Sequence, residues 1–205
     1  MYSPAYNRIA DRAEQIAFLR EHGFALLVTG TGGALQASHL PVLVEERGAT
    51  LALVMHMAKS NPQWREFLDD EVLVVFSGPH AYVSPRWYEQ SERVPTWNYA
   101  AVHAYGSVRV IDDRAAKHAA QARLVQAYDP GWMAAFERLS GEYLGNILEG
   151  IVNFEVAVTR LETRWKLSQN RGRREQELIA AELEKSADSV SRALAALTRR
   201  HLISD

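Results

Sequence analysis

The sequence predicts a mainly β protein with added helices, in the α+β class, built on an antiparallel barrel of six to seven strands. Short runs of alternating or continuously apolar residues are joined by hairpin turns and short connections, as in antiparallel barrels. Helical patterns come late, near 115–128 and 133–148 and again after 173. No Gly-x-Gly-x-x-Gly sequence follows a strand and no phosphate-loop motif is present, which disfavours Rossmann and P-loop nucleotide sites.

The first half of the chain begins with a helix and continues as strands. The expected elements are a helix over 10–21 and strands over 24–29, 35–44, 50–57 and 71–77. The glycine-rich segment 30–33 is expected to form a turn, and 35–44 and 50–57 are expected to pair as a hairpin. Ser60 is expected to cap a helix that contains Pro62 in its first turn and continues over 64–68.

The second half is expected to contain a long polar loop, two long strands and four helical stretches. Strands are expected over 96–112 and from 150 onward, with helices near 115–128, 133–148, 174–185 and 188–200. We expect two domains: a barrel with inserted helices over 1–172 and a C-terminal helical tail over 173–205.

Composition excludes several classes of protein. The chain has 205 residues, of which 47% are hydrophobic and 23% charged, so it is not a disordered chain. It contains no cysteine, which excludes disulfides and thiolate metal sites. With neither a signal peptide nor an apolar stretch of about 20 residues, it is expected to be a soluble, cytoplasmic protein without a membrane partner. The net charge of −2 argues against a strongly basic nucleic-acid binder.

Two segments carry cations in positions suited to an anion. The segment 164–174 holds five basic residues and no acid, directly after a predicted strand. Lys59 and Ser60 lie where another strand meets a helix start, and an anion would be stabilised there. Both patterns also have ordinary explanations, since Ser60 can be a simple cap and basic residues often form a solvated face.

Two further segments have a possible ligand role. Pro41 lies in a predicted strand and lacks a backbone donor, so that strand belongs at a sheet edge or faces a ligand or partner. Trp97, Asn98 and Tyr99 can stack on a planar ring and bind its edge, although aromatic residues in strands are more often core or dimer contacts. The histidines show no metal-binding spacing, and no nucleophile and base pair is evident, so neither a metal site nor a hydrolase is expected.

Six segments of the chain, taken together, carry a family resemblance. They are His39-Leu-Pro41, His56-Met-Ala-x-x-Asn-Pro-Gln-Trp64, Gly78-Pro-His-Ala-Tyr-Val-Ser-Pro85, Val94-Pro-Thr-Trp-Asn-Tyr99, Val102-His-Ala-Tyr-Gly106 and Lys166-Leu-Ser-Gln-Asn-Arg171. Together they resemble the PaiB-like family of FMN-binding negative transcriptional regulators. The resemblance implies a split β-barrel, similar to the pyridoxamine-phosphate-oxidase barrels, that forms a homodimer and binds FMN in clefts between subunits. Heme is the alternative cofactor.

The resemblance also suggests which residues bind FMN. Lys59 and Ser60, with Arg171 or Lys166, are expected to hold the phosphate, and Ser38, His39 and Leu40 to line the ring. Trp97, Asn98 and Gln169 are expected to reach the ring or the ribityl chain, from the same or the partner subunit.

Three functions stay open at this point. The first is an FMN-binding protein of regulatory type. The second is a flavin-dependent oxidoreductase on the same barrel, because bound FMN can accept a hydride. The third is a repressor that binds operator DNA through its tail, where 188–198 superficially resembles a recognition helix with Ser189, Ser191 and Arg192 toward the groove. Two short helices bury little on their own, so packing or dimer bracing is the favoured role of the tail.

Overall fold

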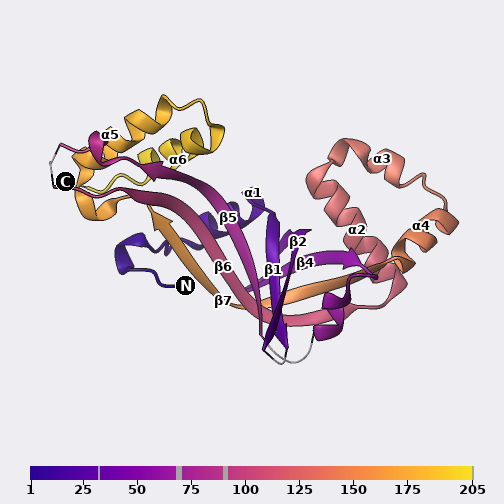
Figure 1. Ribbon diagram of the computed structural model, residues 1–205. Helices are drawn as coiled ribbons and strands as arrows, with labels where there is room; N and C mark the ends of the chain where they lie inside the picture. The colour runs from indigo at the N-terminus through magenta and orange to yellow at the C-terminus, as the bar shows by residue number, and fades with distance from the viewer. Residues whose placement is uncertain (32, 68–70, 90–91, 205) are drawn as a thin grey trace. The chain divides into compact units, whose positions relative to one another are not determined.

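The computed structural model describes residues 1–31, 33–67, 71–89 and 92–204. Its strands form one sheet in the order β2-β1-β5-β6-β7-β4-β3 (Figure 1). They are β1 (Phe24–Thr31), β2 (Ala34–Pro41), β3 (Leu43–Arg47), β4 (Thr50–Ala58), β5 (Val72–Val83), β6 (Thr96–Ile111) and β7 (Ile151–Lys166). β1 pairs antiparallel with β2 and β5, and β4 pairs antiparallel with β3 and β7. The predicted antiparallel β fold with added helices is confirmed.

Helices connect and follow these strands. The α-helices are α1 (Arg12–Glu21), α2 (Arg114–Tyr128), α3 (Met133–Phe136), α4 (Gly141–Glu149), α5 (Arg173–Glu184) and α6 (Ser189–Arg200). Short 3-10 helices are η1 (Ala5–Asn7), η2 (Pro62–Glu66), η3 (Pro85–Trp87), η4 (Pro130–Trp132) and η5 (Gln169–Arg171). Among the described residues, none of these helices combines the length and the apolar character that a bilayer crossing requires.

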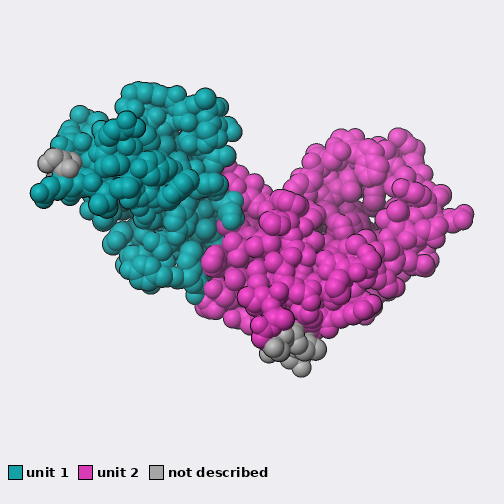
Figure 2. Space-filling view, viewed as in Figure 1, with its two compact units in different colours: residues 1–18, 77–102, 162–205 teal, residues 19–76, 103–161 magenta. Residues whose placement is uncertain are grey.

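The described chain divides into two compact units, shown in different colours in Figure 2. Unit 1 comprises residues 1–18, 77–102 and 162–205, and unit 2 comprises residues 19–76 and 103–161. Strands β5, β6 and β7 each contribute residues to both units.

Each unit has its own apolar core. In unit 1 the rings of Phe18 and Trp165 lie 4.6 Å apart, and both side chains are buried. Helices α5 and α6 of this unit pack on each other and bury Ile179 and Leu194 completely. In unit 2 the ring of Phe67 lies 4.6 Å from that of the fully buried Phe154. Burial of these large side chains is the main source of stability within each unit.

The predicted hairpin between 35–44 and 50–57 is only partly correct. The expected strand over 35–44 is two strands, β2 and β3, interrupted at Val42. β2 pairs with β1, where Leu26 faces His39, and only β3 pairs with β4. β1 and β2 are joined by a short glycine-rich connection, which favours pairing between these neighbours. Of the two alternatives expected for the strand with Pro41, the structure shows the sheet edge, because β2 ends the strand order.

Two helix predictions also need correction. The stretch 133–148 is interrupted after α3, and α4 starts anew where the Ser140 hydroxyl accepts a hydrogen bond of 3.2 Å from the Tyr143 amide. Asn61, not Ser60, caps the helix that follows β4, and this helix is the five-residue 3-10 helix η2. It is too short to provide the helix-dipole anion site expected from the sequence. The predicted turn residue Gly32 and helix end Leu68 lie outside the described residues.

The strand expected over 96–112 forms as β6, and its side chains alternate between two faces. Ala100, Val102 and Ala104 are buried on one face, whereas Tyr99, His103 and Tyr105 on the other face are only partly buried, although Ala101 on that face is also buried. Gly106 on the buried face lies so close to the backbone of Ala157 that a Cβ atom at this position would come within 2.2 Å of its carbonyl oxygen. The buried face therefore requires small residues at the end of this stretch.

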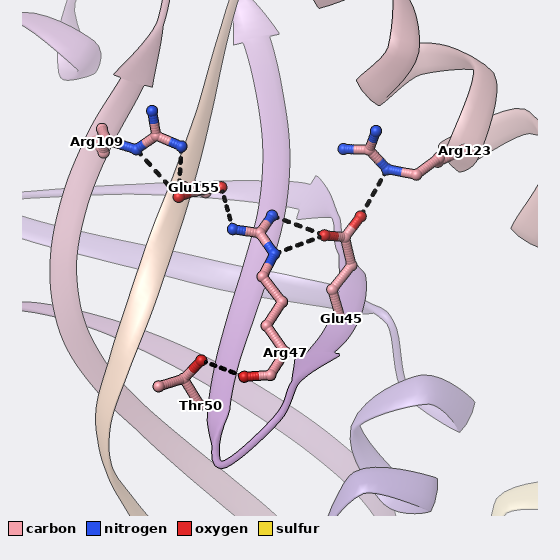
Figure 3. A network of polar contacts seen from close by, with 6 residues as sticks. All are labelled: Glu45, Arg47, Thr50, Arg109, Arg123 and Glu155. Atoms are coloured by element: carbon pink, nitrogen blue, oxygen red, sulfur yellow. Dashed lines mark hydrogen bonds and ion pairs between the residues drawn. The ribbon is translucent and has the colours of Figure 1, made fainter. Parts of the chain in front are cut away.

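A network of charged residues connects β3, β6, β7 and α2 within unit 2 (Figure 3). The nearly buried carboxylate of Glu155 accepts a hydrogen bond from Arg109 at 2.8 Å and pairs with Arg47 at 3.0 Å. Arg47 also contacts Glu45, which in turn pairs with Arg123 at 2.7 Å. Burial raises the pKa of Glu155, but hydrogen bonds from Arg109 and Arg47 outweigh it and hold the pKa below its ordinary value. Glu155 is therefore ionised and holds the two arginines together.

Candidate functional site

Seven of the sequence-predicted site residues, taken with Asn61 and Ser168, form two groups, one in each unit. We call Ser38, Lys59, Ser60 and Asn61 of unit 2 the turn group. We call Asn98, Lys166, Ser168, Gln169 and Arg171 of unit 1 the lysine group.

The turn group is held together by hydrogen bonds of Asn61. The Asn61 Nδ2 donates to the Ser38 hydroxyl over 2.9 Å, and the Asn61 Oδ1 accepts from the Gln63 amide over 3.0 Å. The buried Gln63 side chain in turn donates to the Leu27 carbonyl and the Thr29 hydroxyl. One amide side chain thus joins the edge strand β2 to the turn after β4.

Lys59 and Ser60 are exposed at that turn. The backbone of Lys59 is fixed, because its N–H donates to the Gly150 carbonyl over 2.9 Å and its carbonyl accepts from the Trp64 indole over 3.0 Å. In the described part of the chain, no carboxylate pairs with the Lys59 ammonium. A rigid backbone therefore presents a cation and a hydroxyl that are available to an anion.

His39 and Leu40 are placed differently from Ser38. Leu40 is 8% exposed and belongs to the core. His39 is exposed on the opposite face of β2, where its ring stacks on Phe24 at 5.9 Å. The structure thus brings Ser38 to the turn group, and it does not bring His39 to the same face of the strand.

In the lysine group, Lys166 is surrounded by oxygens and other cations. Its ammonium donates to the Thr96 hydroxyl and, over 2.7 Å, to the Trp97 carbonyl. Burial, together with the nearby charges of Arg164 and Arg171, lowers the pKa of Lys166. No carboxylate in the described residues pairs with Lys166 or Arg171. The local excess of positive charge favours a bound anion.

Ser168, Asn98 and Gln169 are used to build this segment. The hydroxyl of Ser168 and the amide of Asn98 hydrogen-bond in the interior, and both side chains are buried. Both polar atoms of the Gln169 side-chain amide bind backbone groups. The oxygen accepts from the Leu167 N–H, and the nitrogen donates to the Trp165 carbonyl. These three polar side chains stabilise the turn after β7 and have their main partners within the protein.

Arg171 lies over an aromatic ring. Its guanidinium carbon is 4.3 Å from the ring centre of Tyr88, a cation–π arrangement. Burial raises the pKa of Tyr88, whereas the charge of Arg171 opposes this effect. Arg173 and Arg174, which follow, begin α5 and pair with Glu177 and Glu89, as expected for residues of the solvated tail helix.

Trp97 does not share a face with Asn98. Asn98 is completely buried, whereas Trp97 is 55% exposed on the other face of β6. There it lies near His80 and Tyr82 of β5, with ring centres 6.3 Å and 6.1 Å away. The two neighbours therefore cannot reach one ligand from the same side of the strand.

The sequence did not single out Asn61, Tyr88 or Arg164 as site residues. Asn61 connects the turn group, Tyr88 supports Arg171, and Arg164 adds to the positive charge around Lys166. Asn61 lies within the segment His56–Trp64 that carries the family resemblance, so its amide side chain was the available signal. Tyr88 lies between two of the quoted segments, and its aromatic character was the available signal.

Comparison with known proteins identifies the family of this chain. The family model described as "Putative FMN-binding domain" matches residues 1–160. The protein named "Protease synthase and sporulation protein PAI 2" from Bacillus subtilis is 34% identical over 201 residues, which cover 96% of each chain.

Two solved structures with the same fold are of proteins whose names refer to redox cofactors. A FAD and heme binding protein from Mycobacterium smegmatis is similar with a TM-score of 0.62 and 18% identity, covering 78% of this chain and 73% of the other. A flavocytochrome from Azotobacter vinelandii gives a TM-score of 0.61 and 14% identity, with 78% and 69% covered. At these identities the likeness establishes the split β-barrel fold alone. The family match and the Bacillus relative together show that this chain belongs to the FMN-binding, PaiB-like family of split β-barrel proteins.

Proposed function

We propose that this protein is a cytoplasmic homodimer that binds FMN and acts as a negative transcriptional regulator of PaiB type. The observation that carries the flavin part is the presence of cations without carboxylate partners in both groups. Lys59 in the turn group, and Lys166 with Arg171 in the lysine group, have no ion pair among the described residues. Three other arginines of the tail, Arg173, Arg174 and Arg199, are paired with acids.

These residues fit the chemistry of FMN. Its phosphate is a dianion and needs charge-assisted donors, which Lys59, Ser60 and the Lys166–Arg171 segment provide. Burial, and then the charges of Arg164 and Arg171, lower the pKa of Lys166, and a bound phosphate would oppose the effect of these charges. Ser38, fixed by Asn61, adds a hydroxyl beside the turn. We assign phosphate binding to these cations, and bound FMN would supply redox chemistry.

An uncovered apolar sheet face supports a homodimer. The paired register of β2, β1 and β5 places nine uncharged residues on one face in unit 2. They are Phe24, Leu26, Val28, Leu35, Ala37, His39, Pro41, Leu73 and Val75. Phe24 is 69% and Leu35 78% exposed, which is unusual for large apolar side chains.

The occupant that this face fits best is a second copy of the chain. A face without charge offers nothing to an acidic or basic partner, whereas two identical apolar faces are complementary across a twofold axis. Burial in a dimer would remove Phe24 and Leu35 from water. His39 would then lie at the subunit interface.

The regulatory role rests on the name of the Bacillus relative and on the resemblance to the PaiB-like family. The tail is a weak candidate for direct DNA contact. Arg199 pairs with Glu184, and Arg192 donates to the carbonyls of Ser186 and Ala187, so both are already engaged. Phosphate contacts need cations free to bind DNA, so we assign α5 and α6 a packing role.

An absorption spectrum and a flavin titration test the proposal. The purified protein, or the protein mixed with FMN and desalted, is expected to show the flavin absorption bands with about one FMN per chain. Absence of flavin binding under both conditions would contradict the proposal, and a heme spectrum would indicate the alternative cofactor. Consumption of NAD(P)H with added FMN would instead favour an oxidoreductase, and a salt-dependent mobility shift would show operator DNA binding.

A further inference from the structure

A cavity of about 620 Å³ lies within unit 1. One wall is formed by β5, β6 and η3, and the other by the turn between α5 and α6. This volume is in the range typical of small-molecule sites, roughly 300 to 1,000 Å³. The size and the two different walls make it a candidate ligand site.

The first wall is aromatic. It consists of His80, Tyr82 and Trp87 with Trp97. Trp97 is 55% and Tyr82 47% exposed, and their rings meet edge to face with centres 6.1 Å apart. Exposed aromatic faces grouped in a cavity are the usual platform for a planar ligand, whose stacking also removes the rings from water.

The second wall is polar, and its lining residues Glu182, Asp188 and Lys185 carry two acidic charges and one basic charge. Lys185 pairs with Glu182 at 2.6 Å. Asp188 caps α6 through hydrogen bonds from Val190 N, Ser191 N and Ser191 Oγ, and Arg192 lies nearby on the same turn. No unpaired cation lines this cavity among the described residues, in contrast to the surroundings of Lys59 and Lys166.

We propose that this cavity binds a small, neutral, planar aromatic molecule that stacks on Trp97 and is separate from the flavin phosphate site. The second wall, with two acids and one paired cation, gives no preference for an anion, and the aromatic wall favours a flat ring. Because the second wall is the turn between α5 and α6, an occupant would contact the C-terminal helices directly. The inference does not depend on FMN binding.

Titration with 5-fluoroindole, followed by fluorine NMR, tests the site on the full-length protein. The wild type is expected to bind the probe, and Trp97→Ala is expected to weaken binding about tenfold or more because the stacking surface is lost. Val190→Trp, which places a large ring at a partly exposed lining position, is expected to weaken binding to a similar degree. Tyr143→Ala, at an aromatic side chain 54% exposed on α4, is the matched control and is expected to leave binding unchanged.

Four results would overturn the proposal. The first is no binding of 5-fluoroindole to the wild type at millimolar concentration. The second is equal binding by Trp97→Ala, Val190→Trp and Tyr143→Ala, with thermal melting showing that all three are folded. The third is displacement of the probe by FMN, which would make the cavity part of the flavin site. Indole-3-acetate serves as a charge comparison and is expected to bind no more tightly than indole, whereas tighter binding would contradict the neutral ligand class.

Discussion

Asn98 and Ser168 hydrogen-bond to each other through their side chains in the interior of unit 1, with the Asn98 Nδ2 donating to the Ser168 Oγ over 2.9 Å. The two residues are 70 positions apart in the chain. Ser168 has a φ of 63°, and it is the only non-glycine residue with positive φ in the described ranges. The bond thus fixes an unfavourable turn next to Lys166. Because the same turn leads to Arg171, the buried pair determines where both cations lie.

Removing this hydrogen bond is expected to destabilise the protein. Asn98→Ala leaves the buried Ser168 hydroxyl without its partner and should lower the free energy of unfolding by about 1 to 3 kcal/mol. Urea unfolding measures the change. Asn146→Ala, an exposed position on α4, is the control and is expected to stay within about 0.5 kcal/mol of the wild type. Equal stabilities of the two variants would show that the pair does not hold the turn.

The ion pairs of Glu155 with Arg47 and Arg109 predict how the stability of the protein changes in acid. The pKa of Glu155 is held below its ordinary value of 4.5 by Arg109 and Arg47 despite burial. Its contribution to stability is therefore present above pH 4.5 and is lost as the pH falls through the lowered pKa. Arg47→Ala is expected to destabilise the protein most at neutral pH, and the difference from the wild type should shrink in acid. A difference that is constant from pH 7 to about 3 would contradict this origin.

The burial of His56 predicts a second effect of pH on stability, at higher pH than the effect of Glu155. Burial lowers the pKa of His56 from its ordinary value of 6.5, and the strand register places it opposite the buried Asn153. Below pH 6.5 the unfolded chain binds a proton that the folded chain resists, so stability should fall as the pH decreases. His56→Leu is expected to reduce this loss without abolishing it, because burial also lowers the pKa of His22 and His103. Unfolding curves between pH 8 and about 5 measure this loss of stability. If the free energy of unfolding of His56→Leu depends on pH as steeply as that of the wild type, His56 is not the source of the effect.

The apolar face of β2, β1 and β5 predicts the effect of single charges on assembly. Phe24→Asp or Leu35→Asp places a carboxylate in the proposed subunit interface and is expected to convert a dimer to monomers. Light scattering after size-exclusion chromatography measures the mass. Ile147→Asp changes an apolar side chain that is 48% exposed on α4 and should leave the dimer intact. A wild type that is monomeric at all concentrations, or Asp variants that stay dimeric, would rule out this face.

The parts of the fold that depend on local pattern could be predicted from the sequence. β6 was expected because period-2 alternation over 96–112 identifies one buried face, and the structure buries that face. The tail helices were expected from their apolar periodicity and begin within one residue of the predicted positions. The cation-rich segment after β7 was evident because it contains no acid.

Pairing and capping could not be read from local pattern in the same way. The choice of β1 rather than β4 as partner of β2 depends on contacts between strands, which a single sequence does not specify. Ser60 and Asn61 are both good cap residues, and the structure distinguishes them because the Asn61 side chain accepts the capping bond from the Gln63 amide and also donates to Ser38 of another strand. By contrast, the opposite directions of Trp97 and Asn98 follow from strand alternation and could have been anticipated.

The dissociation constant of FMN in variants of the unpaired cations tests the central claim most directly. Lys59→Ala and Arg171→Ala are each expected to weaken FMN binding about tenfold or more, because each removes a charge-assisted contact of roughly 1.5 to 3 kcal/mol. Arg20→Ala, which removes an exposed arginine paired with Glu46, changes the net charge equally and should bind FMN like the wild type. FMN affinity unchanged in both Lys59→Ala and Arg171→Ala would contradict the account.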